Sequence, residues 1–296
     1  MLSKEYLMNP RMSQSKLKPI LDSVEDFKYN LDNPREPSDA QNLGSAVHIL
    51  ILEPEQSNII VKKPELETNS RESKIFKMLL QGRGPNFFPV SSKKKKNQEK
   101  DKFYEVDQEE MNFILQLGSE YGAVFTQPDK YLFLSEKDYD KAHRMAEAAF
   151  KNEDTARILK QTKHFEKTSF YTFKDIDFKC QLDGQGIDDN GTHFILDLKT
   201  TVIKNKDYEI RNEIKKRLYH FQACSYIQPL LNDFIFDINY FILFVRNEPP
   251  YSVFPIQLSL EMIEEGMQLF EKACVDYNHC LEFNPEFIPN NRLRIV

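Results

Sequence analysis

The 296-residue chain has no tryptophan, no closely spaced cysteine pair and no long apolar run. Its four cysteines form no C-x-x-C pair, which argues against a structural zinc site or a disulfide framework and favours reduced thiols. No apolar stretch approaches the roughly 20 residues that a helix needs to cross a bilayer; the longest lies around residues 46–52. Because no signal peptide is recognisable either, we expect a cytoplasmic protein without membrane contact.

An excess of positive charge is also missing. The chain has 40 Lys and Arg against 46 Asp and Glu, a net charge of −6 and a pI near 5.7. Such a chain has no global attraction to nucleic acid, which disfavours a protein that coats DNA non-specifically. A polyanionic partner would have to be met by a local concentration of lysine and arginine. The 40% hydrophobic content, with 23 Phe and 13 Tyr, is typical of a globular protein.

The length predicts one core fold with a large insertion, or two domains. Residues 1–54 read as amino-terminal helices, the last of them a buried core helix capped by Ser38 and Asp39 and ending before Pro54. Residues 55–165 change in composition and predict a mostly helical insertion with a flexible basic loop. Residues 166–296 are predicted to hold the rest of the core.

Period-two alternation in "KTSFYTFKD", "IDFKCQLDGQGIDD" and "GTHFILDLKTT" predicts three antiparallel strands, with a turn at Asp189-Asn190-Gly191. "KDYEIRNEIKKRLYHFQACSYIQPLL" predicts one helix, followed by two strands and a final helix over "SLEMIEEGMQLFEKACVDYNHCLEF". This order predicts an α/β (α+β) fold in which helices flank a central mixed sheet.

Three charged residues fall on the predicted inner strands: Asp183, Asp197 and Lys199. Asp/Glu-x-Lys alone is weak evidence, since the chain contains it five times. Asp197 differs because it lies inside the apolar "FILDLKTT", 14 residues after Asp183. Buried charges are costly unless they pair or bind a metal, and adjacent hairpin strands can bring these side chains together.

The chemistry of this group fits phosphodiester hydrolysis. Two facing carboxylates repel unless a cation lies between them, and an oxygen-rich site suits Mg²⁺ or Mn²⁺, as one or two ions. The main-chain carbonyl of Leu198 is placed to be a third oxygen ligand. Lys199 points to the same face as Asp197, where its ammonium can orient or help deprotonate the attacking water. The alternative is a buried Asp-Lys pair with a purely structural role.

Two further positions have both a functional and an ordinary reading. Gln222 and Tyr226 lie four residues apart on one helix face, where they can hold Lys199 or a phosphate, or simply border an amphipathic helix. His48 is the strongly polar residue of "AVHILIL". A histidine on a buried helix is usually a satisfied core residue, but a neutral imidazole also makes a good metal ligand.

The blocks "GSAVHILILEPE", "CQLDG", "ILDLKTT" and "YHFQACSYI", in this order, resemble the RecE-type exonuclease domain. This is a phage and prophage branch of the PD-(D/E)XK nuclease superfamily, related to the RecB nuclease domain and lambda exonuclease. The resemblance covers most of the chain and is weakest at 55–165. It implies catalytic positions for Asp183, Asp197 and Lys199, a metal-site histidine at His48, and a helix motif that contains Gln222 and Tyr226.

The chain departs from the usual motif in two ways. Leu182 stands where the family pattern has proline, and the central acid is Asp197 instead of glutamate; both changes leave metal binding chemically intact. Glu166 matches an acidic position that precedes the first strand in relatives and is a further candidate ligand. The superfamily's iron-sulfur subgroup needs four cysteines around the core, and Cys274 and Cys280 lack upstream partners, so we expect no cluster.

The resemblance further implies a Mg²⁺-dependent exonuclease that digests one strand of a double-stranded DNA end, typically 5′ to 3′. The exposed 3′ strand would pass to a single-strand annealing or recombination protein, and relatives form trimeric or tetrameric rings. Candidate DNA contacts are Lys215, Lys216 and Arg217, and the run Lys93, Lys94, Lys95 and Lys96, which can equally be a solvated loop. The alternatives are a structure-selective or restriction-like endonuclease, and a non-catalytic DNA- or protein-binding module.

Overall fold

The computed structural model describes residues 4–34, 37–67, 70–81 and 108–283. The run Lys93–Lys96 lies outside these residues. The chain divides into two compact units, one formed by residues 1–56 and 141–296 and the other by residues 57–140. The smaller unit lies within the segment 55–165 that the composition sets apart. No helix in the described part of the chain is both long and apolar enough to cross a membrane.

The described part of the smaller unit is mainly helical. Its elements are β1 (Ile60–Lys62), α5 (Arg71–Leu80), α6 (Gln108–Thr126) and β2 (Leu132–Leu134), followed by the start of α7 (Glu136–Lys151). A two-stranded parallel sheet joins residues before α5 and after α6, and the aromatic ring of Phe76 packs against Tyr121 and Phe133. A partly buried ion pair between Arg71 and Glu110 links α5 to α6.

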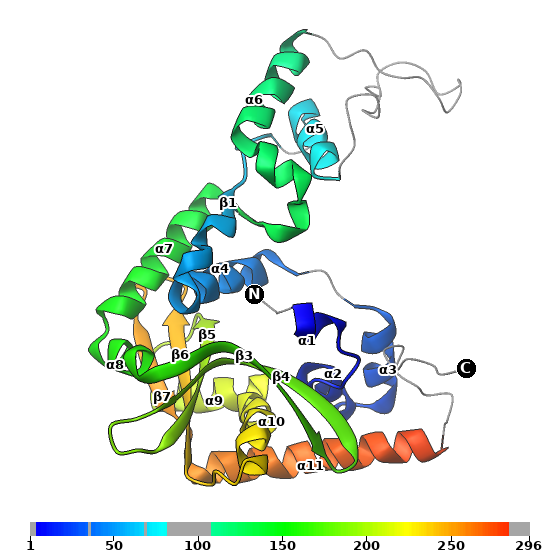
Figure 1. Cartoon of the computed structure of the whole chain (residues 1–296), viewed down its shortest axis with the longest axis vertical. Helices are drawn as coiled ribbons and strands as arrows, with labels where there is room; N and C mark the ends of the chain where they lie inside the picture. Colours follow the sequence, from blue (N-terminus) through cyan, green and yellow to red (C-terminus); the bar gives the residue numbers. More distant parts are fainter. Residues whose placement is uncertain (1–3, 35–36, 68–69, 82–107, 284–296) are drawn as a thin grey trace. The chain divides into compact units, whose positions relative to one another are not determined.

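The larger unit contains a five-stranded mixed sheet in the order β3-β4-β5-β6-β7, which confirms the predicted fold class (Figure 1). The first three strands form the predicted antiparallel meander, β5 runs parallel to β6, and β7 returns antiparallel. The parallel pair requires a crossover, which two helices provide. The strands are β3 (Thr162–Phe173), β4 (Ile176–Ile187), β5 (His193–Thr201), β6 (Ile238–Arg246) and β7 (Val253–Gln257).

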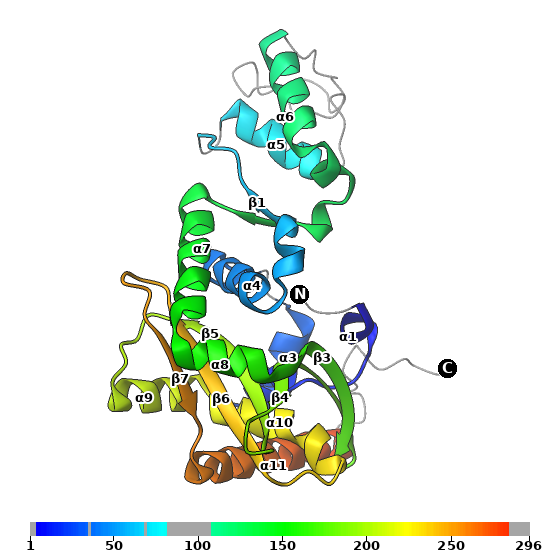
Figure 2. The same cartoon turned by 60° about the vertical axis from the view of Figure 1, so that its left-hand side comes forward.

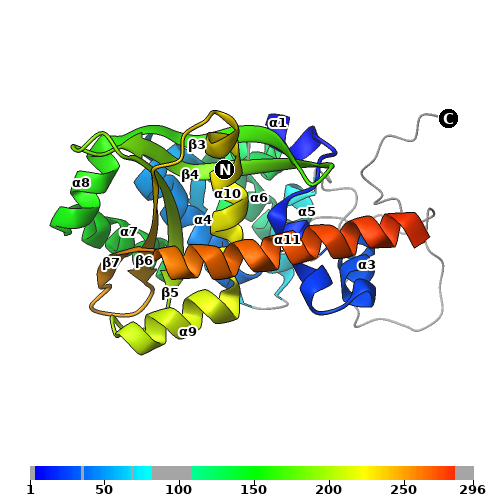
Figure 3. The same cartoon turned by 90° about the horizontal axis from the view of Figure 1, so that it is seen from below.

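Helices cover both faces of this sheet (Figures 2 and 3). Helix α4 (Asp39–Leu52) begins with a capping box between Ser38 and Gln41 and packs on β5. On the opposite face, α10 and α11 enclose an aromatic core in which Phe270 contacts Phe178 and Phe221. The remaining elements are α1 (Lys4–Met8), α2 (Gln14–Leu17), a 3₁₀ turn (Lys18–Leu21), α3 (Val24–Asp32), α8 (Glu153–Gln161), α9 (Asp207–Arg217), α10 (Tyr219–Asn232) and α11 (Leu260–Phe283).

The crossover differs from the single helix that the sequence predicts. Leu218 adopts a left-handed backbone with φ of 56° and separates α9 from α10. A left-handed residue ends one helix and lets the chain turn before the next begins. The break frees α10 to lie against the sheet in its own direction, which fixes where Gln222 points.

Helices α10 and α11 approach so closely that only glycine fits at one position. A Cβ added to Gly266 would lie 2.2 Å from the carbonyl oxygen of His220. We expect Gly266→Ala to lower the free energy of unfolding by about 2 kcal/mol, because overpacking outweighs the gain in helix propensity. Urea denaturation of the purified variant measures this change.

The matched control is Gly44→Ala in α4, where the added Cβ would lie 3.4 Å from Thr200 Oγ1, an ordinary contact. This variant is expected to be as stable as the wild type or slightly more stable. Equal stability of Gly266→Ala and wild type would contradict the close helix contact.

Candidate active site

The strands β4 and β5 separate at the residues singled out in the sequence. Their pairing ends at Gly184 and Leu196, so Asp183 and Asp197 are the next residues along each diverging strand. Asp183 Oδ2 accepts a hydrogen bond of 2.7 Å from the backbone N–H of Leu198. The side chain therefore satisfies a donor that the sheet no longer pairs. This contact fixes the carboxylate of Asp183 next to β5.

Asp197 is fully buried and is held through one oxygen only. Its Oδ1 accepts hydrogen bonds from Lys199 Nζ at 2.9 Å and from Gln222 Nε2 at 2.8 Å. Its Oδ2 is buried with no hydrogen-bond partner among the described residues. Burial raises the pKa of Asp197 to about 6 against the opposing effect of Lys199, and the negative charge of Asp183 adds to the rise. An unpartnered buried carboxylate oxygen is costly, and a cation beside it would remove that cost.

Lys199 remains a charged donor in this setting. Burial by itself would lower the pKa of its ammonium, but the carboxylates of Asp197 and Asp183 outweigh burial, and the pKa is raised. The ammonium also lies 5.2 Å from the ring centroid of Tyr219, in a cation–π contact. A raised pKa suits a group that donates hydrogen bonds, and not a neutral amine that takes a proton from water.

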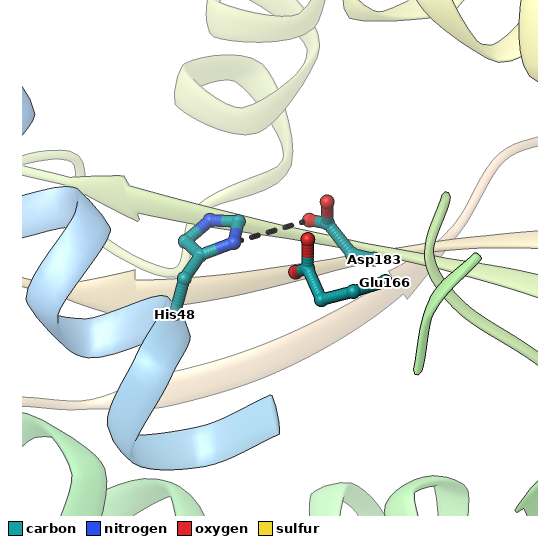
Figure 4. Close-up of side chains that lie close together, drawn as sticks. All are labelled: His48, Glu166 and Asp183. Atoms are coloured by element: carbon teal, nitrogen blue, oxygen red, sulfur yellow. Dashed lines mark ion pairs between the residues drawn. The ribbon is translucent and has the colours of Figure 1, made fainter. Parts of the chain in front are cut away.

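His48 reaches from α4 to both strands (Figure 4). Its Nε2 lies 2.9 Å from the carbonyl oxygen of Leu198. A carbonyl only accepts, so Nε2 carries the hydrogen of this bond. The other ring nitrogen, Nδ1, lies 3.6 Å from Asp183 Oδ2. In the neutral ring Nδ1 is an acceptor too, so this approach calls for a proton or a metal cation between the two atoms.

Glu166 completes a cluster with these residues. It lies between Phe165 and Lys167, whose partners on β4 are Gly184 and Leu182, and is therefore opposite Asp183. Its backbone is left-handed, with φ of 49°. One ligand atom each from His48, Glu166 and Asp183 all lie within 4.8 Å of one another.

The environment of Glu166 favours a proton or a metal cation next to its carboxylate. Its Oε2 accepts a hydrogen bond from Gln181 Nε2. Burial, followed by the charge of Asp183, raises the pKa of Glu166 to about 7. A non-glycine residue in a left-handed conformation costs about 1–3 kcal/mol, and such strain clusters at functional sites. In Figure 4 the Glu166 and Asp183 carboxyl groups both point toward the imidazole.

The remaining predicted site residues that the structure describes are Tyr226 on α10 and three basic residues at the end of α9. Tyr226 is half-buried one turn after Gln222; burial and the charges of Asp197 and Asp183 raise its pKa, but no hydrogen bond ties it to them within the described chain. In the basic end of α9, Lys215 pairs with Glu265 and Arg217 pairs with Glu213, while Lys216 is exposed.

A comparison with family models identifies the family of this chain. Residues 13–288 match the family described as PDDEXK-like domain of unknown function (DUF3799). The chain belongs to this family. It is therefore a member of the PD-(D/E)XK nuclease superfamily, as the sequence blocks indicate.

One solved structure has a similar fold. The crystal structure of a "Putative exonuclease" from Eubacterium rectale aligns over 97% of this chain and 88% of its own, with a TM-score of 0.54 and 12% identity. At that identity the likeness shows the fold alone. A second structure, SSO0001, aligns over 54% of this chain and 69% of its own at 13% identity, with a TM-score of 0.26, and carries no argument. Among curated proteins, no match is found.

The donor atoms of this candidate site fit a hard divalent cation. The fit rests on the unpartnered buried oxygen of Asp197 and on the facing acceptors of His48 and Asp183. Carboxylate and imidazole donors of this kind suit Mg²⁺ or Mn²⁺. Asp197 is not part of the close cluster of His48, Glu166 and Asp183, so the donors form two neighbouring groups instead of one ring.

Sequence reasoning missed two side chains that hold this centre. Gln181 fixes the Glu166 carboxylate, and its spacing of two residues from Asp183 on a strand would have been the available signal, since such residues share a face. Tyr219 lies under the Lys199 ammonium. No pattern distinguishes Tyr219, because its contact depends on the break at Leu218.

The raised pKa of Glu166 predicts how stability depends on pH without metal. The pKa of Glu166 is about 7 in the folded protein and 4.5 in the ordinary, unfolded state, so the folded protein holds this proton more tightly. The resulting contribution to stability is present below pH 4.5 and is lost as the pH rises to about 7. In EDTA, the wild type should lose stability between pH 5 and 8, and Glu166→Gln should lose less. Urea denaturation at these two pH values measures the difference.

The control for this comparison is Glu55→Gln, which alters an exposed glutamate at the start of a surface turn. It should follow the wild type at both pH values. If Glu166→Gln and wild type lose the same stability over this range, the raised pKa is wrong.

Proposed function

We propose that this protein is a Mg²⁺-dependent exodeoxyribonuclease that digests double-stranded DNA ends, 5′ to 3′, and exposes a 3′ single strand for recombination or annealing. The observation that carries the proposal is the buried Asp197 carboxylate. One of its oxygens accepts hydrogen bonds from Lys199 and Gln222, and the other has no partner among the described residues. It lies beside the cluster of His48, Glu166 and Asp183, in a family with a PDDEXK-like domain. PD-(D/E)XK folds typically depend on a divalent metal.

In this proposal Asp183 and Asp197, with His48 and the Leu198 carbonyl, hold the metal, and Glu166 is an additional ligand. The bound ion would supply a Lewis acid for the phosphate and lower the pKa of a coordinated water. Lys199 keeps its proton and donates to the attacking water or to the developing negative charge on the phosphate. Gln222 orients Asp197 through its amide, and Tyr226 borders the same helix face.

Release of nucleotides from ends separates the exonuclease from the endonuclease alternative. With Mg²⁺, the purified protein should shorten end-labelled linear duplex, leave covalently closed circular duplex intact, and do neither in EDTA. A 5′ label released before a 3′ label supports the proposed polarity. Cutting of the closed circle would instead support an endonuclease, and DNA binding without any cutting would support a non-catalytic module.

Substitution at Lys199 tests its role in this chemistry. Lys199→Met should lower the single-turnover rate constant at least about 100-fold, because the reaction loses a positioned donor near the phosphate. Lys204→Met provides a control, since Lys204 follows the same strand but is exposed. A single-turnover assay on linear duplex measures both rates. Wild-type turnover by Lys199→Met would contradict the assignment.

His48→Ala tests the metal ligand on α4. We expect this variant to need about tenfold more Mn²⁺ for half-maximal thermal stabilisation, because a nitrogen donor is lost from the cluster. The control is His143→Ala, an exposed histidine of α7. An unchanged Mn²⁺ titration of His48→Ala would mean that this imidazole does not bind the ion.

A further inference from the structure

The amino-terminal segment, residues 6–12, is hydrogen-bonded to β4, the strand that carries Asp183. Met12 forms a parallel bridge with Phe178, in the part of β4 that β5 does not pair: Met12 N donates to Asp177 O at 2.9 Å, and Lys179 N donates to Met12 O at 2.8 Å. The buried ammonium of Lys179 donates to the carbonyl oxygens of Tyr6 and Asn9, at 2.6 and 2.7 Å. These bonds fix the position of the residues that follow, including the short basic stretch "SKLK".

Lys18 lies at the end of this stretch and reaches the end of α9. Its Nζ donates to the carbonyl oxygen of Arg217, at the last turn of α9. Two residues further on, the ring of Tyr219 lies under the ammonium of Lys199. Lys18 and Lys199 therefore contact the same three-residue segment, 217–219, from different parts of the chain.

Of the positive charges at this point, those of Lys199 and Arg217 are paired with carboxylates, whereas that of Lys18 is not paired within the described residues. No carboxylate lies within ion-pair distance of Lys18 or Lys16 in the part of the chain that the structure describes. Burial lowers the pKa of the Lys18 ammonium, and the nearby charges of Lys199 and Arg217 lower it further, while Asp22 offsets this only in part. Like charges held close together raise the energy of the free protein, and an anion between them would lower it.

We propose that Lys18 binds a phosphate group of the nucleic-acid substrate, next to the phosphate on which Lys199 acts. This inference rests on the proposed nuclease function and adds a substrate contact that none of the sequence motifs assigns. The phosphate is either an internal phosphodiester or the terminal phosphate of the digested strand. In both cases the charge-assisted contact is made by a segment that is hydrogen-bonded to β4, the strand that carries Asp183.

A purely structural role is the competing explanation, since Lys18 also caps the carboxyl end of α9. Substitutions can separate the two roles. Lys18→Gln keeps a donor for the Arg217 carbonyl and removes the charge, whereas Lys18→Arg keeps both. Lys28→Gln removes an exposed positive charge on α3 in the same region of the chain and is the matched control.

Binding to a short DNA duplex is measured in EDTA, as a function of salt concentration, for the wild type and the three variants. Lys18→Gln should weaken binding about tenfold and reduce the slope of log K against log salt by about 0.7–0.9, the value for one lost phosphate contact. Lys18→Arg and Lys28→Gln should retain the wild-type affinity and slope. Thermal unfolding checks that all four proteins are folded alike.

The comparison of 5′-phosphorylated with 5′-hydroxyl duplex identifies the phosphate. If the loss in Lys18→Gln occurs only with phosphorylated ends, the contact is the terminal phosphate; if it occurs with both, the contact is internal. A wild-type slope in Lys18→Gln overturns the proposal, even where the wild type digests DNA.

The nuclease function can fail separately. If the wild type binds DNA but does not cut it with Mg²⁺, and Lys18→Gln still has a reduced slope, the phosphate contact stands and the proposed nuclease function falls. If the wild type neither binds nor cuts DNA, both are overturned.

Discussion

The carboxylate of Asp197 is buried, and yet within the described part of the chain only one of its oxygens is hydrogen-bonded. Burying a charge in this way is tolerated only when neighbouring groups supply opposite charge. Lys199 supplies a positive charge from β5, and Gln222 adds a neutral hydrogen bond from α10. The Oδ2 atom of Asp197 has no partner among the described residues. A metal site is therefore expected here on physical grounds, independently of any family resemblance.

Several features of the fold serve this one buried group. The separation of β4 from β5 opens a place for Asp183, whose side chain pairs with the freed N–H of Leu198. The bend at Leu218 turns α10 so that Gln222 faces Asp197. Helix α4 brings His48 to the other face of β5, where its Nε2 donates a hydrogen bond to the Leu198 carbonyl. Each element thus meets a polar group that an uninterrupted sheet would not leave available.

The sequence predicts those parts of the fold that depend on local pattern. Alternation located β3, β4 and β5, and the capping residue Ser38 located the start of α4. The placement of Asp183 beside Asp197 also followed, because register across a hairpin is set by simple arithmetic. What could not be predicted depends on long-range contact: the break at Leu218 lies in a stretch of continuous helical periodicity, and the left-handed Glu166 lies within a strand.

The pairing of charged side chains also could not be predicted from the local sequence. The sequence drew attention to the basic end of α9, yet there Lys215 and Arg217 are engaged by Glu265 and Glu213. A lysine that already has an acidic partner gains less from a phosphate, since the new contact must compete with the old one. Lys18 stands in an unremarkable stretch of sequence and has no such partner among the described residues. In a chain with a net charge of −6, attraction to a polyanion depends on where positive charge is left unpaired, and not on where it is most abundant.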